Sequence, residues 1–149
     1  MEFPDQDQSH PIISTPGIYY FNIEVTDDQS NIYTDILTVE VLDLAQLDVL
    51  LTGKWDGMSG SLMNSDIENA LKYFHESSRD EYQEIFEIFI DELPIIASEM
   101  GEIELIYVRD RVAKYRITRE EEIQGQIYDI TYFISFVKGH DGLWKIESF

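Results

Sequence analysis

The sequence predicts an α+β fold in which N-terminal helices pack on a curved antiparallel meander sheet, with a β-hairpin ahead of the helices. Apolar residues recur at helical spacing up to Met100, and strict alternation replaces that spacing afterwards. Short polar turns separate the alternating segments, which is typical of sequential antiparallel strands. Helices followed by a run of strands indicate an α+β layer arrangement.

Charge divides the chain into two parts. All ten Lys and Arg lie at or after Lys54, whereas ten of the 30 acidic residues precede it. This change in composition predicts a boundary near residues 43–53. We therefore expect a hairpin segment over 1–43, a linker over 44–53, and a domain over 54–149. A short helix over Leu44–Leu51 is the alternative to the linker.

The first segment has the pattern of two strands and a turn. Gly17–Thr26 and Ile32–Leu42 are rich in aromatic and β-branched residues, and Asp27–Asn31 is polar turn material. These features predict a β-hairpin. In the second strand, one face carries Leu37, Val39 and Val41, and the other carries Ile36, Thr38 and Glu40.

The stretch TPGIYYFNIEVTDDQSNIYTDILTVEVLD, Thr15 to Asp43, resembles the last two strands of an immunoglobulin-like domain of the polycystic kidney disease or cadherin-like type. Such domains end in P-G-x-Y, an alternating strand, V-x-D, a polar turn and T-x-x-V-x-V. The earlier strands of such a domain are absent, and a two-stranded hairpin is marginal alone. The resemblance implies that the hairpin is a domain fragment and that Met1 is not the natural start. The alternative is that the hairpin packs on the second part.

Helical signals follow between residues 59 and 100. Ile67–Phe74 has i, i+3, i+4, i+7 apolar spacing, with Ser65 or Asp66 as its N-cap. Ser78–Glu81 is a capping-box pattern ahead of a second helix, which Pro94 ends. The expected apolar stripe of that helix is Tyr82, Ile85, Phe86, Phe89 and Ile90, and a short helix over residues 95–100 follows.

Four strands are expected after Met100. Their ranges are Ile103–Val108, Val112–Glu122, Ile127–Lys138 and Leu143–Phe149, separated by turns at residues 109–111, 124–126 and 139–142.

The order of helices and strands resembles the cone-shaped fold of the ketosteroid isomerase and nuclear transport factor two superfamily, over roughly Leu51 to Phe149. The words LMNSDIENALKYFHESSRDEY and GHDGLWKIESF resemble the opening helices and last strand of that superfamily, with Ser65-Asp66 where Gly-Asp is commoner. The superfold hosts enzymes, binding modules and scaffolds, so the resemblance implies a fold rather than an activity.

The resemblance also implies a pocket on the concave face of the sheet. The candidate lining residues are Trp55, Tyr107, Tyr128 and Tyr132. The competing interpretation is that the tyrosines are core or rim aromatics with a solvated hydroxyl. No isomerase catalytic acid maps onto this chain, because Asp129 falls on the opposite strand face, so no catalytic residue is assigned.

The opposite face of the same strand is the candidate protein interface. It carries Thr131, Phe133 and Ser135, and an outward Phe133 suits a contact with a partner or a second copy. The basic strand around Lys114 and Arg116 offers either a docking face for an acidic partner or a neighbouring domain, or cross-strand pairing with carboxylates, and the pairing is favoured.

Metal and cofactor signals are weak. His10, His75 and His140 have no His or Cys partner at ligand spacing, and the chain has no cysteine. Asp27, Asp28 and Asp35 are a weak calcium candidate, with a solvated turn as the favoured interpretation. We expect no cofactor and no metal.

These observations predict a non-enzymatic accessory or interaction domain at the C-terminus of a larger, exported multidomain protein, located extracellularly, at the cell surface or in the periplasm. The net charge of −20 disfavours nucleic acid and anionic lipid, and no apolar run reaches 18 residues, so protein or self is the expected partner. The alternative function is a small-ligand binder or isomerase-like enzyme, which requires an open cone cavity above about 300 Å³ and a buried carboxylate. The alternative location is the cytoplasm.

Overall fold

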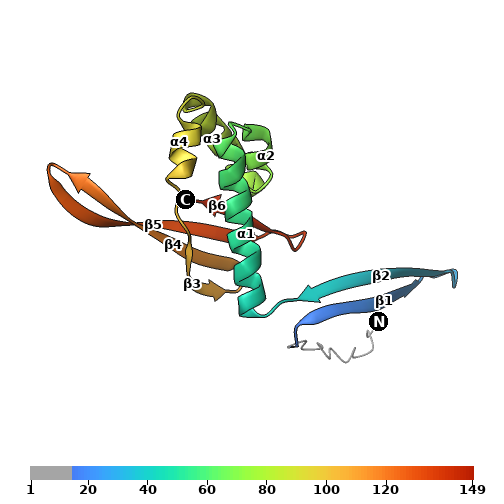
Figure 1. The fold of residues 1–149 in the computed structure, drawn as a ribbon. Coiled ribbons are helices and arrows are strands. Elements are labelled where there is room, and N and C mark those ends of the chain that lie inside the picture. Colours follow the sequence, from blue (N-terminus) through green and yellow to red (C-terminus); the bar gives the residue numbers. More distant parts are fainter. Residues whose placement is uncertain (1–14) are drawn as a thin grey trace, which may run out of the picture. The chain divides into compact units, whose positions relative to one another are not determined.

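The computed structural model describes residues 15–149 and divides the chain into two compact units, with the boundary between Leu47 and Asp48. The first unit contains an antiparallel hairpin of β1 (Gly17–Thr26) and β2 (Ile32–Val41), coloured blue to cyan in Figure 1. The predicted hairpin is confirmed. The unit boundary falls inside the range that the charge distribution predicts.

The hairpin turn is closed by one side chain. The Asp27 carboxylate accepts hydrogen bonds from the backbone N–H of Gln29 at 2.9 Å and of Asn31 at 2.8 Å. It also accepts one from the Asn31 side chain, while Ser30 takes the left-handed conformation with φ 65°. An Asx-type turn of this kind satisfies backbone donors that a tight connection leaves unpaired.

The predicted linker over 44–53 is wrong, because these residues form the first half of a long helix. Helix α1 runs over Leu44–Met63. The Asp43 side chain accepts from the Gln46 N–H at 2.8 Å, and the Gln46 side chain accepts from the Asp43 N–H at 3.1 Å. This reciprocal capping box starts the helix at Leu44 and supplies partners for two otherwise unpaired donors.

Three shorter helices follow, α2 (Ile67–Leu71), α3 (Glu76–Ile88) and α4 (Leu93–Ser98). Asp66 caps α2 as expected, but α3 starts before the predicted capping box: His75 is its N-cap, with Nδ1 accepting from the Ser77 N–H at 3.3 Å. Pro94 lies in the first turn of α4, where its missing N–H costs nothing.

Only part of the predicted apolar stripe of α3 is buried. Tyr82 and Phe86 are buried, whereas Ile85, Phe89 and Ile90 are exposed. The helix therefore presents a narrow stripe, centred on its two aromatic residues, to the core.

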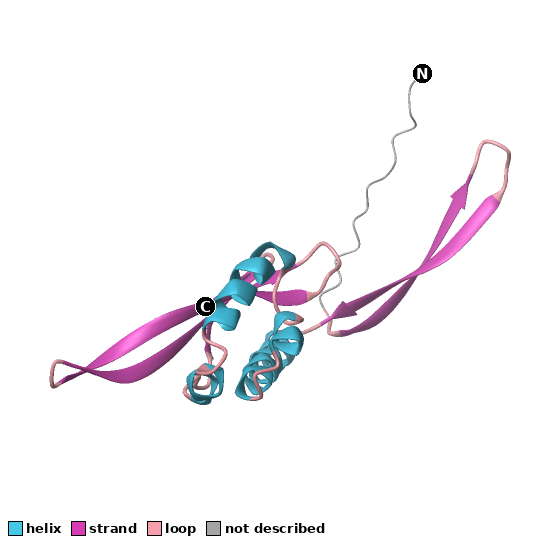
Figure 2. Ribbon diagram, turned by 90° about the horizontal axis from the view of Figure 1, so that it is seen from above, coloured by secondary structure: helices cyan, strands magenta, loops and turns pink. Residues whose placement is uncertain are grey.

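The sheet of the second unit is the predicted meander. Strands β3 (Glu104–Arg109), β4 (Val112–Ile123), β5 (Gln126–Lys138) and β6 (Trp144–Ser148) pair in that order, all antiparallel. β3 pairs with β4 only as far as Arg116, and β6 pairs with β5 only from Ser135. The outer halves of β4 and β5 consequently project as a two-stranded arm, visible in Figures 1 and 2.

Helix α1 lies across one face of the sheet, in the part where β3 and β6 flank β4 and β5 (Figure 1). We call the face towards α1 the inner face and the opposite face the outer face. The buried residues of this helix include Leu51, Trp55, Met58 and Leu62. The buried side chains of the sheet that share this core are Ala113, Tyr115, Ile117, Ile134, Phe136 and Ile146. No helix within residues 15–149 has the length and apolar character needed to cross a bilayer.

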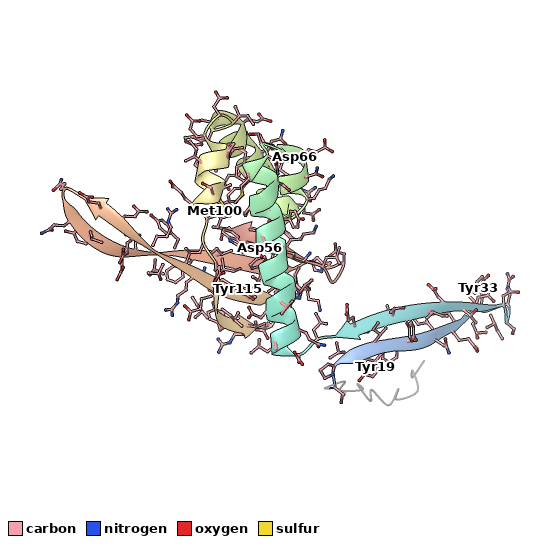
Figure 3. All side chains as sticks on the ribbon, in the orientation of Figure 1. Tyr19, Tyr33, Asp56, Asp66, Met100 and Tyr115 are labelled. Carbon is pink, nitrogen blue, oxygen red and sulfur yellow. The ribbon has the colours of Figure 1, made fainter. Side chains whose placement is uncertain are left out.

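Tyr115 ties the start of α1 to the sheet, and Figure 3 labels it beside the helix. Its ring is fully buried, and its hydroxyl donates to the Asp48 carboxylate at 2.8 Å. Burial raises the pKa of the Tyr115 phenol, and the hydrogen bond to Asp48 and the charge of that carboxylate raise it further.

The aromatic core of the helical layer gives the first prediction. Phe86 is 3% exposed, and its ring centroid lies 5.8 Å from those of Phe74 and Tyr82. Replacing Phe86 with Ala should lower the free energy of unfolding by about 3–5 kcal/mol, because it leaves a cavity. Ile88→Ala, at a position 73% exposed, should change it by less than about 0.5 kcal/mol. Urea unfolding of both variants measures this, and equal losses would contradict the assigned helix face.

Tyr115 gives a prediction that depends on pH. Tyr115→Phe should cost about 1–3 kcal/mol at pH 7, because the Asp48 carboxylate loses its donor. The pKa of this phenol is higher in the folded state than its unfolded value of about 10, so its contribution is complete below pH 10 and declines as the pH rises above it. Urea unfolding from pH 7 to pH 11 should therefore show the wild type approaching the variant above pH 10. If the difference in unfolding free energy between wild type and Tyr115→Phe grew above pH 10, the predicted direction of the pH dependence would be wrong.

Candidate functional site

An apolar cleft of about 170 Å³ lies on the inner side of the sheet, where α1 and α4 meet β4 and β5. Its apolar lining comes from Trp55, Ile96 and Met100 on the helical side, from Ile117 and Ile134 on the strands, and from Phe149. Figure 3 labels Met100 at the passage from α4 to β3. This volume suits a fragment-sized apolar group rather than a drug-sized ligand.

Trp55 is the fixed floor of the cleft. Only 1% of it is exposed, and its indole Nε1 donates to the Gly101 carbonyl at 3.1 Å. The Phe149 ring meets it edge-on, with centroids 5.3 Å apart. A buried tryptophan with its N–H satisfied in this way is held in one rotamer, so the floor is preformed.

The polar rim of the cleft is a small closed network. The Arg119 guanidinium lies 5.0 Å from the Tyr132 ring centroid, and both side chains bind the Glu121 carboxylate, at 3.2 and 2.8 Å. Arg119 also donates to the Glu99 carbonyl at 3.3 Å, while its Nε is buried with no hydrogen-bond partner. The donors at the rim are thus largely engaged within the protein.

The structure brings together two of the four predicted pocket residues. Trp55 and Tyr132 line the cleft, but Tyr107 and Tyr128 do not. Tyr128 lies on the projecting arm, where its hydroxyl donates to Gln126 at 2.7 Å. Tyr107 is turned outward by a β-bulge: Leu105 faces Tyr115, but Tyr107 then pairs with Lys114 instead of Ala113. The extra residue reverses the alternation, so the prediction for Tyr107 is wrong.

The predicted pocket did not include the other six lining residues, which are Ile96, Met100, Ile117, Arg119, Ile134 and Phe149. The alternation of β4 contains a signal for Arg119, because residues 115, 117 and 119 share one face of the strand. No local sequence pattern predicts that Ile96, Met100 and Phe149 share one cleft, because their proximity depends on tertiary packing.

The predicted interface residues have different environments. Phe133 faces outward and is 53% exposed, with the Lys114 ammonium 5.5 Å from its ring centroid. Thr131 is also exposed, and its hydroxyl lies 3.4 Å from that of Thr118. Ser135 is buried and accepts a hydrogen bond from Lys114 at 2.9 Å, so its assignment to an exposed interface is wrong.

One residue of the basic strand, Arg116, forms the favoured cross-strand pair with a carboxylate. The Arg116 guanidinium forms a cross-strand ion pair with Glu104 at 2.9 Å on the outer face. Its side chain and that of Glu104 are well exposed, so the pair contributes little to stability.

The calcium candidate receives no support from the described residues. Both Asp27 oxygens are engaged in the turn, and Asp35 accepts from the backbone N–H of Ile36. The hydrogen bond from the Asn31 side chain is the largest cause that lowers the pKa of the Asp27 carboxyl. Within residues 15–149 no three His, Asp or Glu side chains gather as metal ligands. His10 lies outside the described residues.

Comparison with known proteins returns no match among family models, curated proteins or solved structures.

The cleft gives the third prediction, for which adjacent residues of α4 supply a matched pair. Ile96 lines the cleft, whereas Ile95 points away and is 63% exposed. Ile96→Trp should fill the cleft and abolish the saturable amide NMR shifts that a fragment-sized apolar probe, toluene, induces around Trp55 and Met100, while Ile95→Trp should leave those shifts unchanged. Circular dichroism checks that both variants fold. Equal toluene-induced shifts in the two variants would show that the cleft does not bind the probe.

Proposed function

We propose that this chain is a non-enzymatic interaction domain, carried near the C-terminus of a larger, exported multidomain protein. In this proposal the second unit is a domain of the ketosteroid isomerase and nuclear transport factor two type, and the hairpin completes an immunoglobulin-like sandwich. The observation that carries the proposal is a hairpin face on which every residue except Gly17 and Asp35 is aliphatic or aromatic.

The strand register defines that apolar face. Residues directly opposite in an antiparallel pair share a face, so the register places the odd-numbered residues of both strands together. The apolar members of this face are Tyr19, Phe21, Ile23, Val25, Tyr33, Leu37, Val39 and Val41, with Asp35 as its one acidic member. Figure 3 labels Tyr19 and Tyr33, which lie towards opposite ends of the hairpin. The even-numbered face is mixed, with Asn22, Glu24, Glu40 and three threonines among its apolar residues.

A two-stranded sheet with one such face needs a covering layer. None of the residues in β1 and β2 is buried, and a hairpin alone is marginally stable in water. Sandwich strands bury alternate residues against a second sheet about 10 Å away. We therefore assign the covering layer to further strands of an immunoglobulin-like domain. Such strands match both this alternation and the sequence resemblance over Thr15–Asp43.

The outer face of the second unit's sheet supports self-association as the partner mode. Phe133 and Tyr107 are exposed there, beside Lys114 and the Arg116–Glu104 pair. A two-fold dimer requires a self-complementary surface, and a face that carries both signs of charge around apolar residues can meet that requirement. We therefore assign a second copy of this chain as the occupant of this face.

The alternative function, a ligand binder or isomerase-like enzyme that uses the cone pocket, needs a large cavity and a buried carboxylate. The described residues provide neither in that pocket. The alternative requires a cone cavity above about 300 Å³, whereas the cleft measures about 170 Å³. Within residues 15–149 no Asp or Glu lines the interior of the cleft, and the Glu121 carboxylate at its rim is partly exposed and already bound to Arg119 and Tyr132. No observation therefore favours it as a second candidate.

Hydrogen exchange tests the proposal for the hairpin. In this chain alone, the β1 and β2 amides should exchange much faster than the central sheet amides, because no second sheet covers the apolar face. The central sheet amides are those of Val112–Arg116 in β4 and of Phe133–Val137 in β5. A chain of residues 42–149, which retains all of α1 and its Asp43–Gln46 capping box, should keep the melting temperature of the second unit. Hairpin amides as protected as those of the central sheet would overturn the proposal, because they would show a cover within this chain.

Sedimentation tests the second copy. Wild-type protein should form a dimer that tightens as salt screens the net charge of −20. Phe133→Ser should weaken the dimer at least tenfold, whereas Ile88→Ser, at an exposed position of α3, should not. A monomer at all salt concentrations, or equal effects of the two variants, would rule out this face as the interface.

A further inference from the structure

A second hollow, separate from the apolar cleft, lies where the start of α3 meets β6 and the turns of the sheet. We call it the charged cleft, and it measures about 620 Å³. Its basic side chains are Arg79, Arg111, Lys138 and Lys145, and its histidines are His75 and His140. Phe74 and Val137 form the apolar part of its wall. The volume lies within the usual range for small-molecule sites.

The backbone around this cleft is well tied. The His75 N–H donates to the Ile146 carbonyl at 2.7 Å, and the Ile146 N–H donates to the Tyr73 carbonyl at 2.8 Å. These bonds fix the α2–α3 connection against the edge of β6. On the other side, the Gly139 N–H donates to the Leu143 carbonyl at 2.8 Å and closes the β5–β6 turn.

The cleft reverses the charge balance of the chain. Four of the ten basic residues line it, against three of the 30 acidic residues, Glu76, Asp141 and Glu147. The first turn of α3 contributes the positive end of a 13-residue helix at the same place. In a chain of net charge −20, this concentration of cations is a local exception.

The cations are positioned by carbonyl oxygens rather than neutralised by carboxylates. Arg111 Nε donates to the Lys138 carbonyl at 2.9 Å, Arg79 Nη2 donates to the Phe74 carbonyl at 3.3 Å, and Lys145 donates to the Lys72 carbonyl. The two ion pairs in the described part of the chain involve Arg116 and Arg119, neither of which lines this cleft. The terminal nitrogens of Arg111 make no hydrogen bond among the described residues and are oriented by the bond at Nε.

The effect of this clustering extends to α1. The pKa of the Lys54 ammonium is lowered, first by burial and then by the nearby positive charge of Lys145. The ammonium groups of Lys54 and Lys145 repel each other, and an anion bound at Lys145 would reduce this repulsion.

From this geometry we infer that the charged cleft binds a small oxyanion with two negative charges, such as a dicarboxylate or a phosphate group, in addition to the interaction role proposed above. A guanidinium whose terminal nitrogens are available binds carboxylate or phosphate oxygens in a bidentate manner. Because its position is already fixed, little side-chain entropy is lost on binding. The three carboxylates of the cleft and the net charge of the chain oppose an extended polyanion, so the ligand is small.

Amide NMR titration of the full chain at constant ionic strength tests the inference. Sodium succinate and sodium phosphate are the anionic probes, and methylammonium chloride is the cationic control. At least one anion should give saturable shifts confined to residues 74–79, 111 and 137–147, with a Kd of about 1 mM or tighter. The anion that binds more tightly identifies the carboxylate or the phosphate as the preferred chemistry. Shifts that stay linear for both anions, or saturation by methylammonium alone, would overturn the inference.

Matched variants distinguish specific anion binding in the charged cleft from nonspecific attraction of anions to any basic side chain. Arg111→Gln should weaken binding at least tenfold, whereas Arg111→Lys, which keeps the charge but loses the planar fork, should weaken it less. Arg79→Gln is the second variant, because Arg111 also supports a turn. Arg116→Gln makes the same charge change on the outer face and should leave binding unchanged. If Arg116→Gln weakens binding as much as Arg111→Gln and Arg79→Gln do, attraction is nonspecific and the inference fails. Its failure would leave the hairpin and dimer experiments unaffected.

Discussion

The second unit depends on the way Phe149 joins three separate elements. Its ring stacks on Tyr82 of α3 at 5.0 Å and meets Trp55 of α1 edge-on. The Tyr82 hydroxyl donates to the Phe149 carbonyl at 3.0 Å and accepts from the Phe149 N–H at 2.8 Å. Since aromatic contacts of this kind bury large areas with defined geometry, they fix where the helices sit on the sheet. The apolar cleft is a consequence, because Phe149 and Trp55 form two of its walls.

Much of the fold could be predicted because its signals are local. The alternation in β4 and β5, and the turns on either side of them, depend on residues adjacent in sequence, so their bounds were predicted to within a residue. The full length of helix α1 was missed, and only the alternative of a short helix over Leu44–Leu51 anticipated its first half. Gly53, Gly57 and Gly60 weaken the helical pattern, and the signal that starts the helix is the pair Asp43 and Gln46. One of these glycines has a tertiary reason: a Cβ at Gly57 would collide with the Tyr73 hydroxyl.

The candidate sites were less predictable, because they depend on register and on distant contacts. A single bulge between Leu105 and Tyr107 reverses which side of the sheet Tyr107 faces. The residue types in that strand give no signal that predicts the bulge. Ser135 was assigned to the surface by alternation, but Lys114 covers it. The charged cleft gathers side chains from positions as far apart as His75 and Lys145. Scattered histidines and lysines give no sequence pattern, so only the fold shows that they meet.

The projecting arm has a consequence for how the molecule avoids aggregation. Beyond Arg116 and Ser135 its two strands have no neighbouring strand within residues 15–149, which leaves backbone donors and acceptors along both margins. Bare margins of this kind recruit strands from other chains. Glu120, Glu121, Glu122 and Asp129 are concentrated near the tip, where β4 and β5 turn. When two arms approach, the negative charges on one arm repel those on the other. This repulsion opposes strand pairing between molecules.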